Sequence, residues 1–210
     1  MLVNKKIYFR IFGVVLTWFL LCQTMAVGAE KISDAGFDKK VLEIAQQCRA
    51  DVMQEFENML ASNVLSFNKL FDTFYIPIPN TNPQKYTTQY DGITDKRIRI
   101  ILDKYLAMDD RLLFVVAVDR NGYLPTHNSK YSKPLTNDQE YNTKNNRTKR
   151  LFNDRTGLAA ARNRDEYLLQ RYERDTGESF YDLSLPIFIK EKHWGAIRIG
   201  FKEDKSQKDQ

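Results

Sequence analysis

The sequence has little cysteine, little histidine and no long hydrophobic run in its body, and each shortage excludes a class of protein. Its 210 residues include two cysteines and two histidines. That is too few for a disulfide-rich scaffold and, without close Cys/His spacing, for a structural zinc site. Beyond the N-terminal segment there is no stretch of about 18 apolar residues, so a polytopic membrane protein is excluded. The hydrophobic content of 42% and the charged content of 28% are typical of one ordinary globular domain.

Catalytic motifs are also missing. No Gly-rich phosphate loop follows a predicted strand, and the chain has no Gly-x-Ser-x-Gly nucleophile elbow. No pair of carboxylates has a spacing that indicates acid–base chemistry. We therefore expect a protein that is not an enzyme, with a hydrolase as the weakest alternative.

Residues 1–29 are predicted to be a secretory signal peptide. Basic residues precede an apolar stretch at 11–25, and small residues at 27–29 form a cleavage site. We expect cleavage after Ala29 and a periplasmic protein. The alternative is an uncleaved membrane anchor, although the apolar stretch is short for a span of about 20 residues.

Removal of this segment changes the charge and the cysteine count. The formal net charge is +5, and the segment carries three positive charges and no carboxylate, so +2 remains after cleavage. Most of the basic excess is thereby lost, and we expect no nucleic-acid partner. Cys48 is then the lone cysteine. It lies on the apolar stripe of a predicted helix, which favours a buried and unreactive thiol.

Residues 30–75 are predicted to form a long N-terminal helix. Apolar residues recur at spacings of three and four from Phe37 to Phe74. A helix over 34–74 would be roughly 60 Å long, which exceeds the width of a small domain. We therefore expect it to project from the core or to pair with a second chain in a homodimer.

Residues 76–202 are predicted to form an α+β domain. Three prolines make 76–92 an extended connection, and a second helix is expected at about 94–107. A buried strand at 112–118 is followed by an Asn-Gly turn, after which 123–126 should return as its hairpin partner. Strands joined by hairpins predict an antiparallel sheet.

The second half of this domain is less regular. Residues 128–146 are predicted to be irregular, 147–161 look helical, and 167–174 are ambiguous between helix and strand. Strands are expected at 180–189 and 194–201, and Pro186 suggests an edge position or a bulge in the first of them. The last segment, 203–210, is a charged tail that we expect to be disordered.

Several blocks of this chain, in order, resemble the Cache-type (PAS-like) sensory domain of bacterial methyl-accepting chemotaxis receptors. The resemblance covers roughly 37–202. The blocks are YIPIPNTNPQKY at 75–86, DRNGYLPTHN at 119–128, KYS at 130–132, NRTKRLFNDRTGLAA at 146–160, LLQRYERD at 168–175, PI at 186–187 and HWG at 193–195.

The resemblance implies a long N-terminal helix packed on a five-stranded antiparallel sheet. It also implies a small-molecule pocket between the sheet and the loops that cover one face, and it favours a strand at 167–174. A receptor would continue into a membrane span and a signalling coiled coil, whereas this chain ends soon after its last predicted strand. We therefore expect a stand-alone exported sensor domain that depends on a membrane receptor or another signalling protein.

The predicted ligand site consists of polar and aromatic side chains around the irregular segment. They are His127, Arg150, Arg147, Tyr123, Asp119, Tyr131 and Asn128. A neutral imidazole at the end of a strand could hydrogen-bond a carboxylate ligand, or could bind a metal ion or haem iron. An arginine could bind a carboxylate through two parallel hydrogen bonds.

Each of these residues also has a structural interpretation. His127 and Asn128 could tie a loop to the backbone, and the two arginines could line a solvated helix face. The Asp119 carboxylate could cap its turn, and the two tyrosines could belong to the core.

The sequence thus predicts an exported module that binds a small polar metabolite, an organic acid or an amine, and passes the signal to a partner. No cofactor is expected. One alternative is a haem- or metal-binding sensor that uses His127. Another is a non-catalytic structural protein that forms dimers through its long helix.

Overall fold

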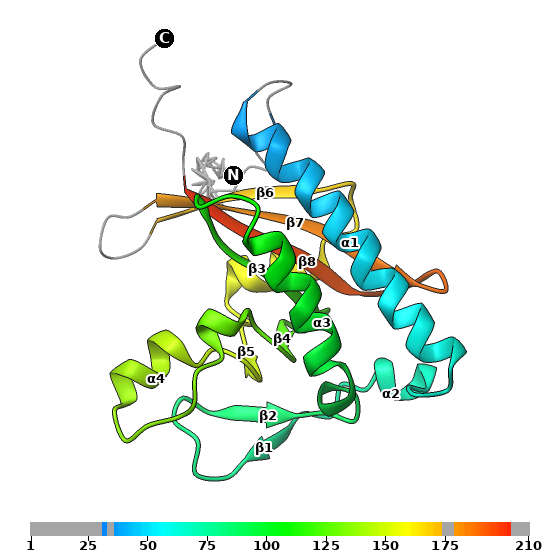
Figure 1. The fold of residues 1–210 in the computed structure, drawn as a ribbon, viewed down its shortest axis with the longest axis vertical. Coiled ribbons are helices and arrows are strands. Elements are labelled where there is room, and N and C mark those ends of the chain that lie inside the picture. The colour runs from blue at the N-terminus through cyan, green and yellow to red at the C-terminus, as the bar shows by residue number, and fades with distance from the viewer. Residues whose placement is uncertain (1–30, 33–35, 174–178, 203–210) are drawn as a thin grey trace, which may run out of the picture.

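The computed structural model describes residues 31–32, 36–173 and 179–202, which form an α+β fold (Figure 1). The predicted signal peptide at 1–29 and the predicted tail at 203–210 lie outside the described residues. The elements are α1 (Phe37–Ala61), α2 (Phe67–Leu70), β1 (Ile76–Ile78), β2 (Lys85–Thr87), α3 (Asp91–Leu106), β3 (Leu112–Asp119), β4 (Tyr123–Leu124), η1 (Ser129–Tyr131), α4 (Gln139–Asn145), β5 (Arg150–Leu151), α5 (Arg155–Arg162), β6 (Leu168–Glu173), β7 (Ser179–Ile189) and β8 (Lys192–Lys202).

The main sheet has four strands, in the antiparallel order β3-β8-β7-β6. The expected single five-stranded sheet is wrong, because β4 does not pair with β3 and instead forms a separate two-stranded sheet with β5. The reason lies in the turn between them. The backbone N–H of Tyr123 donates to the Asp119 carboxylate at 3.0 Å, so this donor is not available to a β3 carbonyl.

The main core lies between the sheet and two helices. Helix α1 packs across β7 and β8, while α3 packs against β3 and α1 (Figure 1). The predicted apolar stripe supplies this contact, because Val41, Ala45, Cys48 and Val52 are all fully buried. Cys48 thus has the predicted buried position.

The opposite face of the sheet carries a second, smaller core. Side chains alternate along β3, so that Val115 and Ala117 face the main core while Val116 and Val118 face the second one. Ala161 of α5 packs there, and α5 also contacts β7 and β8. This second face is the one on which the resemblance places a ligand.

The long N-terminal helix is shorter than predicted. It ends at Ala61 and not near 75, although the apolar periodicity continues to Leu70. Asn63 adopts a left-handed conformation with φ of 57°, and its N–H donates to the Leu60 carbonyl at 3.2 Å, which ends a helix. Ser66 then caps the short α2 by accepting a hydrogen bond from the N–H of Lys69 at 3.3 Å.

Two other predictions need correction. Residues 147–161 are not one helix, because β5 precedes α5 and Asp154 caps α5 by accepting from the N–H of Gly157 at 3.0 Å. Strand β7 is an inner strand of the sheet. The alternative prediction of a bulge near Pro186 is confirmed, because the pairing of β7 with β8 has a register shift between Ile187 and Phe188. Strand β6 begins opposite Ser184, so among the described strands Pro186 pairs only with β8.

The segment at 128–146, predicted to be irregular, contains η1 and α4, and Asp138 caps α4 by accepting from the N–H of Tyr141 at 3.0 Å. Other elements agree with prediction. The second helix is α3, the buried strand is β3, and the ambiguous segment at 167–174 contains β6. Trp194 has the packing position expected of a large aromatic residue at a strand start. It is 1% exposed, its Nε1 donates to the Leu70 carbonyl at 3.0 Å, and its ring lies 4.9 Å from that of Phe56.

Candidate functional site

A polar segment, residues 129–150, lies beside β4 and the β1–β2 hairpin, and we call it the cover. It consists of η1, α4, β5 and their connections. Between 131 and 150 the buried residues are Asn142 and Asn146, and no apolar side chain is fully buried there. Hydrogen bonds therefore hold the cover in place more than apolar packing does, and such a segment has low local stability.

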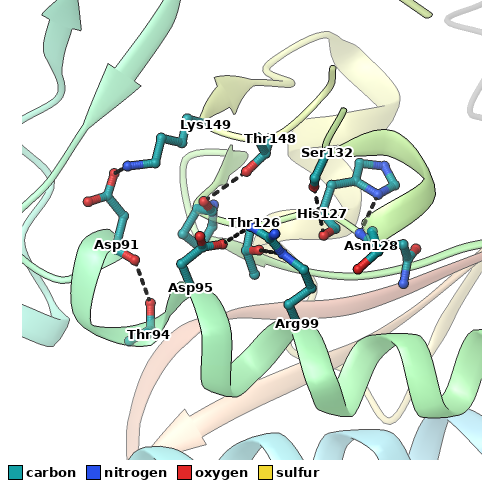
Figure 2. Close-up of polar contacts among 12 residues, drawn as sticks. Asp91, Thr94, Asp95, Arg99, Thr126, His127, Asn128, Ser132, Thr148 and Lys149 are labelled. Carbon is teal, nitrogen blue, oxygen red and sulfur yellow. Dashed lines mark hydrogen bonds and ion pairs between the residues drawn. The ribbon is translucent and has the colours of Figure 1, made fainter. Parts of the chain in front are cut away.

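His127 lies beneath the cover. It is 3% exposed, and its Nδ1 accepts a hydrogen bond from the N–H of Asn128 at 2.8 Å (Figure 2). The ring centroid is 4.8 Å from that of Tyr131 in η1 and 6.3 Å from that of Phe114 in β3. Burial lowers the pKa of His127 well below its ordinary value, and nearby Arg147, Lys130 and Arg150 lower it further. The imidazole is therefore neutral at physiological pH.

Asn128 connects β3 to α3. Its Oδ1 accepts a hydrogen bond from the N–H of Val115 at 3.0 Å, so the side chain substitutes for a neighbouring strand at the free edge of β3. Its Nδ2 donates to the Asp103 carboxylate at 3.3 Å. Both polar atoms of this predicted ligand residue thus have partners inside the protein.

Arg147 and Arg150 converge on one aromatic ring of the second core. Both guanidinium carbons lie 5.1 Å from the centroid of Phe152. Arg150 also donates to the Thr143 carbonyl of the cover at 3.3 Å. Burial and nearby Arg147 lower the pKa of Arg150, which shows that like charges are close together here.

Two lysines that the sequence analysis missed, Lys85 and Lys149, form a positive cluster together with Arg147 and Arg150. Lys85 is 6% exposed, and its Nζ donates to Oδ1 of Asn146 in the cover. Burial lowers the pKa of Lys85 to about 8, with further lowering by Arg150 and Lys149. Lys149 forms an ion pair with Asp91 at 3.1 Å (Figure 2). No periodicity marks Lys85 as buried, because it follows an irregular proline segment.

Helix α3 supports the cluster from below. Arg99 forms an ion pair with Asp95 and donates to the Thr126 hydroxyl at 3.2 Å (Figure 2). The Asp103 carboxylate accepts from the N–H of Ser129 at 2.9 Å. These contacts fix the chain on both sides of His127 to a rigid helix.

Asp119 and Tyr123 belong to a hydrogen-bond network that meets the positive cluster at Asp91, the partner of Lys149. The Asp119 carboxylate accepts from the hydroxyls of Tyr75 at 2.7 Å and Tyr90 at 3.2 Å, and from two backbone N–H groups of its turn. The hydroxyl of Tyr123 donates to Asp91 at 2.8 Å. Burial raises the pKa of Asp119, against the opposing effect of these donors. The carboxylate therefore has the contacts of a turn cap.

A buried ion pair lies in the sheet face near these groups. Arg198 of β8 pairs with Asp182 of β7, and Asp182 is 1% exposed. Gln170 and Ser184, on neighbouring positions of the same face, are also buried. The alternation of apolar and polar residues along these strands marks the polar positions in the sequence. Such a pattern usually indicates that the polar side faces solvent, whereas in the structure α5 covers this side of the sheet.

Open space in the structure lies elsewhere. A hollow of about 520 Å³ is lined by Arg120, Arg164, Lys190, Glu191, Lys192 and His193 around the β7–β8 turn. A narrow crevice beside it is lined in part by Asp119 and Trp194. Neither of these two spaces is lined by His127 or Arg150.

Within the described ranges, no group of three or more His, Cys, Asp or Glu side chains forms a candidate metal site. The described helices also include none that is long and apolar enough to cross a membrane.

Comparison with known proteins gives little further information. No protein-family model matches the chain, and no curated protein matches it. Among solved structures, an extracellular ligand binding receptor from Desulfohalobium retbaense DSM5692 aligns with 80% of this chain at 14% identity and a TM-score of 0.35. The chain covers 26% of that receptor, about a quarter of its length. The correspondence between the two folds is loose.

Proposed function

We propose that this protein is an exported, non-catalytic sensor domain that binds a small organic acid beneath the cover and passes its occupancy to a membrane-bound signalling partner. The observation that carries the proposal is a positive cluster in which Arg147 and Arg150 lie close to the neutral imidazole of His127, and Lys85 and Lys149 lie close to Arg150 and to each other. Burial lowers the pKa values of Lys85 and Arg150, and their positive neighbours lower them further. A bound carboxylate would relieve this repulsion, whereas a ligand ammonium would add to it.

The contacts suggest how a ligand enters. Lys85 reaches the cover through one neutral acceptor, the side-chain carbonyl of Asn146. A ligand carboxylate is a stronger acceptor for an ammonium group than an amide is. It would displace Asn146, release the cover and leave Lys85 and Arg150 to bind the ligand. The protein would thus have two arrangements of the cover, and the ligand would favour one of them.

Calorimetric titration with succinate tests this function. We expect binding to the wild type, and a loss of about tenfold or more in affinity for Lys85→Met and for Arg150→Gln, because each removes a charge-assisted hydrogen bond. Lys96→Gln is the control, since Lys96 is an exposed lysine of α3 outside the cluster. Absence of succinate, malate and citrate binding at millimolar concentration, or equal affinity in all four proteins, would contradict the proposal.

The alternative of a structural protein that forms dimers depends on α1. Because the apolar stripe of α1 packs across β7 and β8 of its own chain, it is already used inside the monomer.

The haem or metal alternative depends on His127, whose Nδ1 already accepts a hydrogen bond from Asn128. An absorbance spectrum and a metal analysis of the protein from its own host test that alternative.

A further inference from the structure

The hollow at the β7–β8 turn is positively charged and lies apart from the cover. Its lining includes Arg120, Arg164, Lys190 and Lys192 against one carboxylate, Glu191. Within the described part of the chain, none of these four cations forms an ion pair. Four cations with one acid around an open space of about 520 Å³ produce a concentrated positive potential.

Aromatic rings hold several of these cations in place. Nζ of Lys192 lies 4.4 Å from the ring centroid of Phe71, next to α2, and Nζ of Lys190 lies 5.9 Å from that of Phe67. The Arg164 guanidinium lies 5.8 Å from the centroid of Phe188. Ordered side chains lose less conformational entropy on binding than free ones do, so this hollow is partly preorganised.

His193 lies in the same hollow with an unsatisfied nitrogen. Its Nε2 is buried and has no hydrogen-bond partner among the described residues. Its ring lies 5.2 Å from that of Phe188. A buried nitrogen without a partner is costly, so the described residues do not fully satisfy this ring.

The turn itself has an unfavourable sequence for its shape. Lys190 and Glu191 both have positive φ, 47° and 64°, which are the angles of a two-residue hairpin turn that favours Asn-Gly. Residues other than glycine adopt this region at an energetic cost, because Cβ comes close to the backbone carbonyl. Local strain of this kind is often maintained for the side chains that it displays, and here those side chains line the hollow.

We infer that this hollow is a second binding site, one that takes a multivalent phosphate-bearing anion. Guanidinium groups bind phosphate oxygens through paired hydrogen bonds, and lysines add charge without a fixed geometry. Two cations from the turn, Lys190 and Lys192, line the hollow together with Arg120 and Arg164, so an anion with more than one phosphate group can contact several of them. The phosphate could belong to a free small molecule or to a lipid headgroup, and the experiment separates these sources.

The test uses inorganic pyrophosphate in calorimetric titrations and, in parallel, sedimentation with phosphatidylglycerol vesicles and with phosphatidylcholine vesicles. The site variant is Arg164→Gln with Lys192→Gln. The matched control, Lys39→Gln with Lys96→Gln, removes the same charge from exposed positions on α1 and α3. We expect pyrophosphate binding that the site variant weakens by about tenfold or more and the control preserves.

If the protein binds phosphatidylglycerol vesicles but not pyrophosphate, and this binding depends on Arg164 and Lys192, the phosphate belongs to a lipid headgroup. The inference is overturned if neither probe binds, or if the site and control variants lose affinity equally. Arg150→Gln should leave pyrophosphate binding unchanged, so this site and the site beneath the cover are tested independently.

Discussion

The Nζ atom of Lys85 and the Oδ1 atom of Asn146 form a buried hydrogen bond between the β1–β2 hairpin and the cover. The donor is a cation and the acceptor is a neutral amide, so the charge of Lys85 has no anionic partner at this contact. Arg150 and Lys149 are close enough to depress its pKa. The cover is therefore attached through a contact whose strength depends on the protonation of one amine.

The first prediction concerns stability in alkaline solution. The pKa of Lys85 is lowered to about 8 in the folded protein from 10.5. Between these values the unfolded chain binds more protons, so this lysine makes the free energy of unfolding rise with pH from about 8 to 10.5. Denaturant unfolding across this range should show a smaller rise in Lys85→Met than in wild type. Identical pH profiles would mean that Lys85 is an ordinary solvated lysine.

The second prediction concerns acid. Because His127 stays neutral in the folded protein, the unfolded chain alone takes up its proton below about pH 6.5. The free energy of unfolding should therefore fall by up to about 1.4 kcal/mol per pH unit from this residue. His127→Gln should reduce this slope, measured by urea unfolding between pH 7 and 5. His193, whose pKa burial and Arg164 also lower, remains in both proteins and cancels in the comparison.

The third prediction concerns the ion pair of Asp182 and Arg198. Asp182→Leu or Arg198→Met alone should cost about 3–5 kcal/mol, because each leaves a buried charge without its partner. Replacing both, with Asp182→Leu and Arg198→Met, should recover most of that loss. Additive losses in the double variant, measured by chemical denaturation, would show that the two side chains do not interact.

The fourth prediction concerns Cys48. Its thiol is fully buried on α1, and burial raises its pKa, so the reactive thiolate does not form near neutral pH. Ellman's reagent should fail to modify the native protein and should react with one thiol per chain after unfolding, if the segment with the other cysteine has been removed. Rapid reaction in the native state would show that the packing of α1 opens.

The amphipathic patterns of the sequence predicted most of the main core. The apolar stripe that places Val41 and Val52 against the sheet follows from helical periodicity, and the β-branched run at 112–118 follows from strand propensity. Periodicity failed at Asn63, because one left-handed residue ends a helix without changing the spacing of apolar residues. It failed again at Tyr123, because a side-chain carboxylate took the N–H that a hairpin needs.

The candidate site was harder to predict, for a physical reason. His127 and Arg150 were selected by residue type and position, and the structure brings them near each other, but their ligand role stays a prediction. Lys85 was missed because its burial results from contacts with a segment about 60 residues away, which no local pattern records. Arg164 and Lys192 were missed because charged residues at turns usually indicate only solvent exposure.

Pro186 has a consequence for how this molecule behaves in a crowded compartment. Beyond Ser184, β7 extends past the start of β6, and among the described strands only β8 pairs with it there. An apolar flank of this kind invites a strand from another molecule to add to it, which is a common first step of aggregation. Since proline brings no N–H group to this flank, it interrupts the ladder that an incoming strand would need, and the protein remains protected where its own sheet is incomplete.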